Sequence, residues 1–193
     1  LDYLQQQSEQ VLYTDGFRLE WQFTIISQLS HYQKEESLTL SGLKRSDFQS
    51  GIKGEATDLY VLTNDNGVEV TITNYGGIIV SVMVPDKNGV MRDVVHGFDN
   101  VEDYANIDNN FGATIGRYGN RIAHGKIVVD GVEYNLPQNN NGHTLHGGPE
   151  GFNTKVFKAN QLDNQTLEMT YLSADGEMGF PGNLNVKGTM KLT

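Results

Sequence analysis

The chain has 193 residues, of which 14 are basic and 24 acidic, so its formal charge at pH 7 is −10. This acidic balance argues against a nucleic-acid backbone or an anionic membrane surface as the main partner. The sequence contains no cysteine, which excludes disulfides and thiolate-bound metals and is compatible with a reducing or an oxidising compartment.

The first forty residues differ in pattern from the rest. Apolar residues alternate strictly with polar ones over one stretch, which predicts an amphipathic strand: Phe17, Leu19, Trp21, Phe23 and Ile25. The polar segments around it, 5–7 and 33–36, show no periodicity. We therefore expect residues 1–40 to be an N-terminal extension that can lend one strand to a sheet, and residues 41–193 to form the main domain.

Further strands are predicted along that domain. Val68, Val70 and Ile72 alternate with polar residues, which is typical of a half-buried strand. Stretches 167–172 and 184–192 show the same period of two. The run 78–84 is almost wholly apolar and suits a strand buried on both faces, while it is far too short to cross a bilayer.

Turn signals separate these stretches. Asp130-Gly131 lies between two apolar runs and predicts a hairpin, because both residues tolerate a positive φ. Similar signals occur at 65–67 and 87–89, and Asn100 is a good cap for one short helical turn at 100–104. Many short strands with glycine-rich turns predict an all-β sandwich or barrel rather than a βαβ fold.

Polar residues crowd against glycines in the segment 111–122. Its glycines allow close approach of a ligand to the backbone, and Asn120 and Arg121 supply directional donors. An arginine fork can hold two vicinal hydroxyls or a carboxylate, although a simple ion pair with one of the many acidic residues is an equal alternative. The glycine spacing does not match a dinucleotide-binding loop.

A second polar segment, 139–148, contains three asparagines and two histidines. A histidine can exchange a proton near neutral pH or donate a hydrogen bond to a ring oxygen. His143 and His146 would point to opposite faces of a strand, and no carboxylate completes a site, so we expect no metal. The paired glycines Gly147 and Gly148 favour exposure of His146 to a groove.

A third segment, 175–182, holds Asp175 and Glu177 close together. Paired carboxylates can hydrolyse glycosides, but two on one tight loop rarely have the required separation. The glycines and Pro181 favour a turn ahead of the final strand.

Several of these motifs, in this order, resemble the aldose 1-epimerases, or galactose mutarotases. They are Gly116–Ile122, Leu145–Gly148 with Gly151-Phe152, and Asp175–Gly182, preceded by Asn74–Gly77 and Ser41–Lys44. The resemblance covers residues 41–193 and leaves residues 1–40 outside.

The resemblance implies an all-β fold, an antiparallel β-supersandwich of the galactose mutarotase-like type, incomplete in this chain. It implies an isomerase that interconverts the α and β anomers of hexoses such as galactose and glucose without a cofactor. A glutamate base takes the proton of the C1 hydroxyl while a histidine acid protonates the ring oxygen. Asn120 and Arg121 match the family's sugar-binding pair, and His146 matches the first of its two active-site histidines, binding sugar near the reacting centre. Asn153 stands where many relatives have Asp.

The motifs that carry the family's second histidine and its glutamate base do not occur in this sequence. We therefore expect about half of a catalytic domain, with one wall of the sugar site and no useful activity on its own, since losing a positioned acid or base typically costs ~10²–10⁴-fold. Strand edges left open by a partial sandwich can drive association, including a homodimer.

Two alternatives remain open at this point. The first is a non-catalytic carbohydrate-binding β-sandwich. The second is a hexose-6-phosphate 1-epimerase-like protein, for which only Arg117, Arg121 and Lys126 in the central segment could supply the cations. In each case the expected partner is a small-molecule hexose or its phosphate, not a nucleic acid or a membrane. The start at Leu1 says little about export, and we expect the cytoplasm rather than the periplasm.

Overall fold

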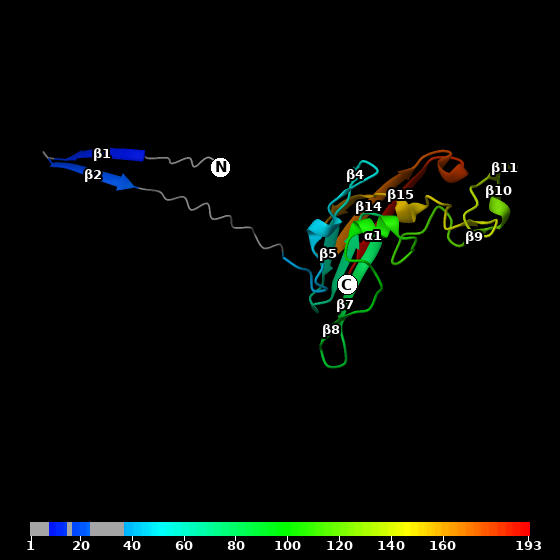
Figure 1. Ribbon diagram of the computed structural model, residues 1–193, viewed down its shortest axis with the longest axis horizontal. Coiled ribbons are helices and arrows are strands. Elements are labelled where there is room, and N and C mark those ends of the chain that lie inside the picture. Colours follow the sequence, from blue (N-terminus) through cyan, green and yellow to red (C-terminus); the bar gives the residue numbers. More distant parts are fainter. Residues whose placement is uncertain (1–7, 15–16, 24–36) are drawn as a thin grey trace. The chain divides into compact units, whose positions relative to one another are not determined.

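The computed structural model describes residues 8–14, 17–23 and 37–193, and the chain divides into two compact units, Leu1–Glu35 and Glu36–Thr193. In the first unit, strands β1 (Ser8–Thr14) and β2 (Phe17–Phe23) pair antiparallel along their whole length (Figure 1). The alternating pattern correctly predicted β2, and Ile25 lies outside the described residues. Strand β1 was missed. Treatment of residues 1–40 as an extension stays a prediction.

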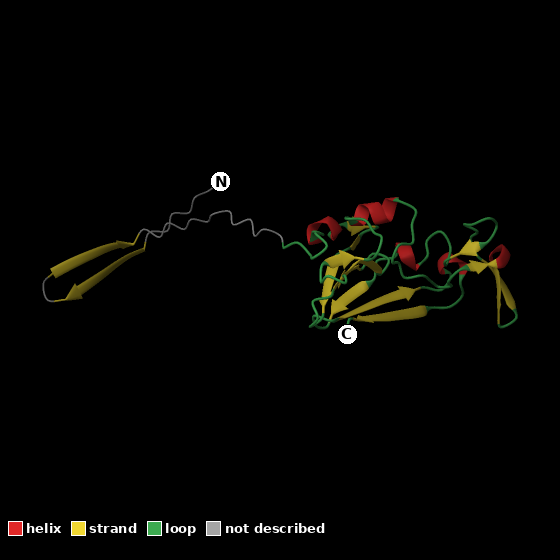
Figure 2. Ribbon diagram, turned by 90° about the horizontal axis from the view of Figure 1, so that it is seen from below, coloured by secondary structure: helices red, strands yellow, loops and turns green. Residues whose placement is uncertain are grey.

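The second unit is built on two antiparallel sheets (Figures 1 and 2). One has the order β5-β6-β7-β8, comprising Leu59–Thr63, Glu69–Thr73, Ile78–Pro85 and Met91–Asp93. The other has the order β13-β14-β15, comprising Lys158–Gln161, Thr166–Ser173 and Leu184–Lys191. All pairings within these sheets are antiparallel. The predicted all-β class is confirmed.

Short elements connect and cover the sheets. The strands are β3 (Gly51–Ile52), β4 (Glu55–Ala56), β9 (Arg121–Ile122), β10 (Lys126–Val129), β11 (Val132–Asn135) and β12 (Thr144–Leu145). The helical turns are η1 (Arg45–Phe48), α1 (Val101–Asn106), η2 (Ala123–Gly125), η3 (Phe152–Thr154) and η4 (Glu177–Gly179). No helix in the described ranges is long and apolar enough to cross a membrane.

The two sheets share one apolar core. It contains the buried side chains Leu62, Ile72, Phe152, Phe157, Leu167 and Met169. Full burial of each such side chain contributes roughly 1.5–3 kcal/mol to the driving force for folding. Tyr60, Tyr171 and Val186 pack against this core while remaining partly exposed, so the core is incompletely covered at one end.

The opposite face of the four-stranded sheet is covered by η1 and α1. Phe48 and Val101 from these turns are fully buried against Leu59, Ile78 and Val80 of the sheet. Both faces of β7 are therefore occupied, as its apolar run predicted.

The prediction of a half-buried strand was wrong for β6. Its polar residues Glu69, Thr71 and Thr73 are all buried, because the covering turns exclude water from that face. The hydroxyl oxygens of Thr71 and Ser81 are 2.7 Å apart and hydrogen-bond across the strands, while the Leu40 N–H donates to Glu69 Oε1. These partners satisfy the buried polar groups.

Two local predictions are confirmed in detail. Asp130 and Gly131 have φ values of 51° and 82° and close the two-residue hairpin between β10 and β11, as expected of a turn with two positive φ angles. Asn100 caps α1 by accepting the Asp103 N–H at Oδ1, at 2.8 Å.

Candidate functional site

Asn120 and His146 lie opposite each other beyond a short ladder between β9 and β12. Leu145 pairs with Arg121 and Thr144 pairs with Ile122 in that ladder. The His146 N–H donates to the Asn120 carbonyl oxygen at 3.0 Å, and the Asn120 N–H donates to His146 Nδ1 at 3.0 Å. The two residues thus exchange hydrogen bonds, although they are 26 positions apart.

The bond to Nδ1 determines where the neutral imidazole carries its proton. A ring nitrogen that accepts an N–H has no proton of its own, so the proton lies on Nε2. His146 is half-buried, and Nε2 has no hydrogen-bond partner within the described part of the chain. The site therefore presents a fixed N–H donor to a ligand.

Asn120 and His146 both have positive φ angles, which are uncommon for residues other than glycine. The φ angle is 65° at Asn120 and 54° at His146. Such conformations persist only where surrounding contacts enforce them, and they cluster at functional sites. Here the reciprocal hydrogen bonds supply part of that enforcement.

The guanidinium of Arg121 is held on one side and open on the other. Its Nε donates to Asn140 Oδ1 at 3.0 Å, and its Nη1 donates to Asn120 Oδ1 at 3.3 Å. Arg121 is exposed, and Nη2 has no partner among the described residues. This edge of the guanidinium can reach vicinal hydroxyls, as can Nδ2 of Asn120, which likewise has no partner in the described ranges.

The asparagine run at 139–141 supports the candidate site. The sequence placed this run in a candidate segment but assigned no role to its individual asparagines. Asn140 orients Arg121, and Asn139 bonds both backbone groups of Leu145, accepting its N–H at 2.7 Å and donating to its carbonyl oxygen at 3.1 Å. The signal was the density of amides, but only the fold shows which groups they contact.

His143 has a separate set of contacts. Its Nδ1 accepts the His124 N–H at 3.0 Å, and the two imidazole centroids lie 5.4 Å apart. Within the described residues, no group of three or more histidine or acidic side chains could hold a metal ion.

Arg117 has a different role from Arg121. All three guanidinium nitrogens donate to Ser173 at the end of β14 or to the loop that joins β14 to β15, so the group is not available to a phosphate. Lys126, the other basic residue considered, forms an exposed ion pair with Glu133 at 2.7 Å.

The two carboxylates of segment 175–182 shape the loop. Asp175 Oδ1 accepts the Gly182 N–H at 2.5 Å, and the Asp175 N–H donates to Asn183 Oδ1 at 2.8 Å. Glu177 accepts hydrogen bonds from Tyr171 and Ser173. These contacts agree with a turn and do not support a hydrolytic carboxylate pair.

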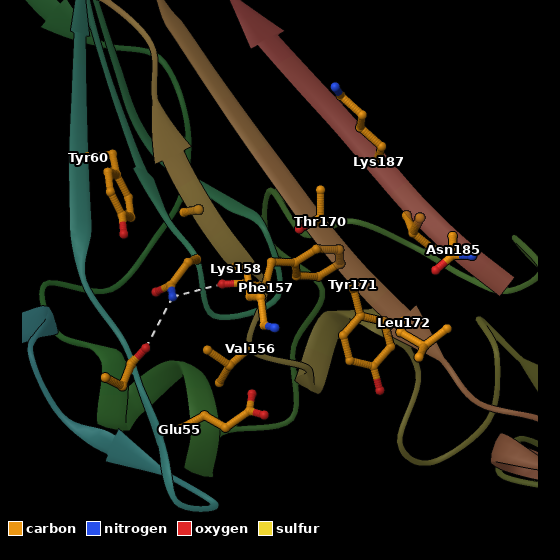
Figure 3. Close-up of a pocket in the computed structure, with 14 residues that line it drawn as sticks. Glu55, Tyr60, Val156, Phe157, Lys158, Thr170, Tyr171, Leu172, Asn185 and Lys187 are labelled. Atoms are coloured by element: carbon orange, nitrogen blue, oxygen red, sulfur yellow. Dashed lines mark hydrogen bonds between the residues drawn. The ribbon is translucent and has the colours of Figure 1, made fainter. Parts of the chain in front are cut away.

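A separate hollow lies between β5 and the sheet β13–β15 and has a volume of about 810 Å³. Tyr60, Phe157 and Tyr171 lie around it (Figure 3). Because these side chains belong to or pack against the core shared by the sheets, the hollow is an uncovered end of that core. Asn120, Arg121 and His146 do not line this hollow. We place the candidate site at these three residues because hydrogen bonds link them to one another.

Comparison with known proteins points in one direction. The family model described as aldose 1-epimerase matches residues 58–193. The chain is 40% identical to the galactose mutarotase of Rattus norvegicus over 139 residues, which cover 72% of this chain and 40% of the relative. It is 37% identical to the aldose 1-epimerase of Escherichia coli K12 over 141 residues, covering 72% and 40% of the two chains.

Two solved structures are also similar. A GalM/aldose epimerase homologue from C. elegans superposes with a TM-score of 0.68 at 28% identity, covering 71% of this chain and 42% of that one. The galactose 1-epimerase of Lactobacillus acidophilus NCFM superposes with a TM-score of 0.64 at 25% identity, covering 72% and 41%. The chain thus spans about 40% of the length of the relatives it matches.

Proposed function

The chain belongs to the aldose 1-epimerase family, and from that premise we propose that it supplies one wall of the sugar site of a hexose mutarotase. The substrate class is a neutral hexose such as galactose or glucose. The observation that carries the proposal is the reciprocal hydrogen bonding of Asn120 and His146 beside the open fork of Arg121. Together they present fixed N–H donors, which suit hydroxyl and ring oxygens.

In the proposed reaction a base removes the proton from the C1 hydroxyl as the ring oxygen gains one. The bond between C1 and the ring oxygen breaks, the aldehyde rotates about C1–C2, and the ring closes on the other face. We assign His146 Nε2 to a hydrogen bond near the reacting centre, and Asn120 and Arg121 to the hydroxyls. No cofactor enters this scheme.

The proposal separates binding from catalysis. The motifs expected to carry a second histidine and a glutamate base are absent from these 193 residues. We therefore expect the chain to bind hexose without accelerating anomer exchange, because each missing acid or base costs ~10²–10⁴-fold.

The phosphorylated-substrate alternative has less support. Arg117 is committed to the β14–β15 loop and Lys126 to Glu133, which leaves Arg121 as the remaining cation of the three. A competition experiment between galactose and a hexose 6-phosphate would distinguish these substrates.

Isothermal titration with galactose and polarimetry on the same 193-residue chain test the proposal. We expect measurable binding that is lost in His146→Ala and in Arg121→Ala, together with an anomerisation rate equal to the uncatalysed one. Absence of binding contradicts the sugar wall. A rate near that of a full-length relative contradicts the assignment of proton transfer to missing residues.

A further inference from the structure

The Arg117 side chain forms hydrogen bonds that connect the backbone near the proposed sugar site to the loop between β14 and β15. Its Nε donates to Ser173 Oγ at 2.7 Å, its Nη2 to the carbonyl oxygens of Ser173 and Ala174 at 2.8 Å, and its Nη1 to the Pro181 carbonyl oxygen at 3.0 Å. The guanidinium carbon also lies 5.8 Å from the centroid of the Phe180 ring. The side chain thus holds both ends of the loop that contains η4.

Glu177 completes the network inside that loop. Its Oε1 accepts from the Tyr171 hydroxyl at 2.5 Å and from Lys155 Nζ at 3.1 Å, and its Oε2 accepts from Ser173 Oγ. The Ser173 hydroxyl is fully buried and bridges the guanidinium to the carboxylate. We call this set the Arg117–Ser173–Glu177 clasp.

The charge of Glu177 is maintained by its partners. Burial alone raises the pKa of this carboxyl, but hydrogen bonds from Ser173, Tyr171 and Lys155 outweigh burial and leave the pKa below its usual value. The clasp therefore joins a permanent cation to a carboxylate that is ionised at neutral pH.

The backbone of Arg117 packs directly against the turn that follows His146. The Gly116 carbonyl oxygen accepts the Phe152 N–H at 3.1 Å. A Cβ atom placed on Gly147 would lie 1.8 Å from that same oxygen and 2.9 Å from the Arg117 nitrogen. Gly147 directly follows His146, and Arg117 precedes Asn120 by three positions, so the clasp and the site share two short segments.

We propose that the clasp positions the sugar site: it holds segment 116–120 at the separation from turn 146–151 that lets Asn120 and His146 exchange hydrogen bonds. Arg117 and Ser173 are positioning residues, because their polar side-chain atoms contact the loop and each other. The inference deepens the proposed function and rests on it for its meaning. Its structural content, the geometry of His146, is measurable without sugar.

A clasp with only a stabilising role predicts a different result. Weakening it would then lower the melting temperature and leave the His146 imidazole unchanged. The ring nitrogens of histidine report directly on the tautomer and on the hydrogen bond at Nδ1, so their ¹⁵N chemical shifts separate the two roles.

The test compares R117K with R92K in the full 193-residue chain labelled with ¹⁵N-histidine. R117K keeps the positive charge and loses the planar guanidinium. R92K makes the same change at an exposed residue of β8, whose Nε lies 3.5 Å from Asp86 Oδ2. With resonances assigned through His146→Gln, we expect R117K to lose the pure Nε2–H signature and to bind galactose about tenfold more weakly, as small misplacements of binding groups do. We expect R92K to change neither.

A second variant covers the case in which R117K does not fold, as judged from the amide signals of β6 and β7 in a uniformly ¹⁵N-labelled sample. S173A removes only the bridging hydroxyl and should shift the same His146 signals. Unchanged imidazole shifts in the folded variants overturn the inference, even if their melting temperatures fall. If the wild-type chain binds no hexose while the variants still shift His146, the proposed function fails and the positioning role stands.

Discussion

Arg121 depends on a neighbour that sequence reasoning did not single out. The Asn140 side chain accepts a hydrogen bond from Nε of Arg121, and Nη2 at the far edge of the guanidinium has no partner in the part of the chain that the structure describes. A flexible arginine loses side-chain entropy when it binds, and a fixed one loses less. In the proposed site, Asn140 therefore supports Arg121 without needing to touch a ligand.

Replacing this neighbour should weaken hexose binding. Asn140→Ala removes one hydrogen bond to a charged group, so we expect galactose affinity to fall by about three- to tenfold, which corresponds to ~0.7–1.4 kcal/mol. Isothermal titration measures it. Asn160→Ala, on the exposed part of β13, is the control, and equal affinities for both variants would show that Arg121 does not need the support.

Glu69 shows how a residue prediction can fail through tertiary context. The alternation of β6 assigned it to a solvated face, but η1, α1 and the segment around Leu40 cover that face. Burial raises the pKa of the Glu69 carboxyl, and the hydrogen bond from the Leu40 N–H lowers it less than burial raises it.

The ionisation of Glu69 makes the stability of the fold depend on pH. A carboxyl whose folded pKa is raised contributes stability that is fully present below its unfolded pKa, about 4.5, and is lost as pH rises through the folded pKa. Glu69→Gln should therefore melt at a higher temperature than wild type at pH 7, by about 2 °C or more, and the difference should shrink as pH falls through the raised folded pKa and be absent below about pH 4.5. Calorimetry across pH checks this, with the exposed Glu133→Gln as control; a difference that grows in acid contradicts the assignment.

At the scale of elements, the ladder between β9 and β12 is short, and its geometry depends on glycine. Gly147 has a φ of 89°, and a side chain there would overlap the Gly116 carbonyl oxygen. Gly131 has a similar φ of 82°, but a Cβ atom there would meet no neighbour within 4 Å.

Alanine substitutions at these two glycines separate the effect of backbone strain from the effect of steric overlap. Gly131→Ala should cost only the backbone strain, about 1–2 kcal/mol. Gly147→Ala carries the same strain plus the overlap, so we expect a larger loss of stability and loss of galactose binding. Thermal unfolding and titration provide the measurements. Similar losses in the two variants would mean that the close approach of 116 and 147 is not needed.

At the scale of the whole molecule, the main feature is the sandwich core of the second unit, which is open at one end. The 810 Å³ hollow exposes parts of Tyr60, Tyr171 and Val186, and β15 is an edge strand of eight residues. Open edges and uncovered apolar faces favour association, which the charge of −10 opposes only through long-range repulsion.

We expect the chain to self-associate as its concentration rises, and more strongly at high salt, where charge repulsion is screened. Val186→Lys places a charge in the hollow and should shift sedimentation velocity profiles toward the monomer. Val128→Lys on the exposed β10 hairpin is the matched control. A monomer at all concentrations, or equal effects of the two variants, contradicts association through this end of the core.

The sequence alone determined those features of this protein that depend on neighbouring residues. The period of two at β14 and β15, the Asp130-Gly131 turn and the Asn100 cap each depend on residues a few positions apart, and all are confirmed. The motif resemblance likewise identified the family from short segments. Assignment of Asn120, Arg121 and His146 to sugar contact remains a prediction.

Only the tertiary structure decided which groups meet across long stretches of chain. Asn120 bonds His146 26 positions away, Arg117 reaches Ser173 56 positions away, and Glu69 accepts the N–H of Leu40 29 positions away. No periodicity encodes such contacts, because they depend on how the sheets and turns pack together. For the same reason two arginines four positions apart differ: all three nitrogens of the Arg117 guanidinium are hydrogen-bonded, whereas Nη2 of Arg121 has no partner among residues 8–14, 17–23 and 37–193.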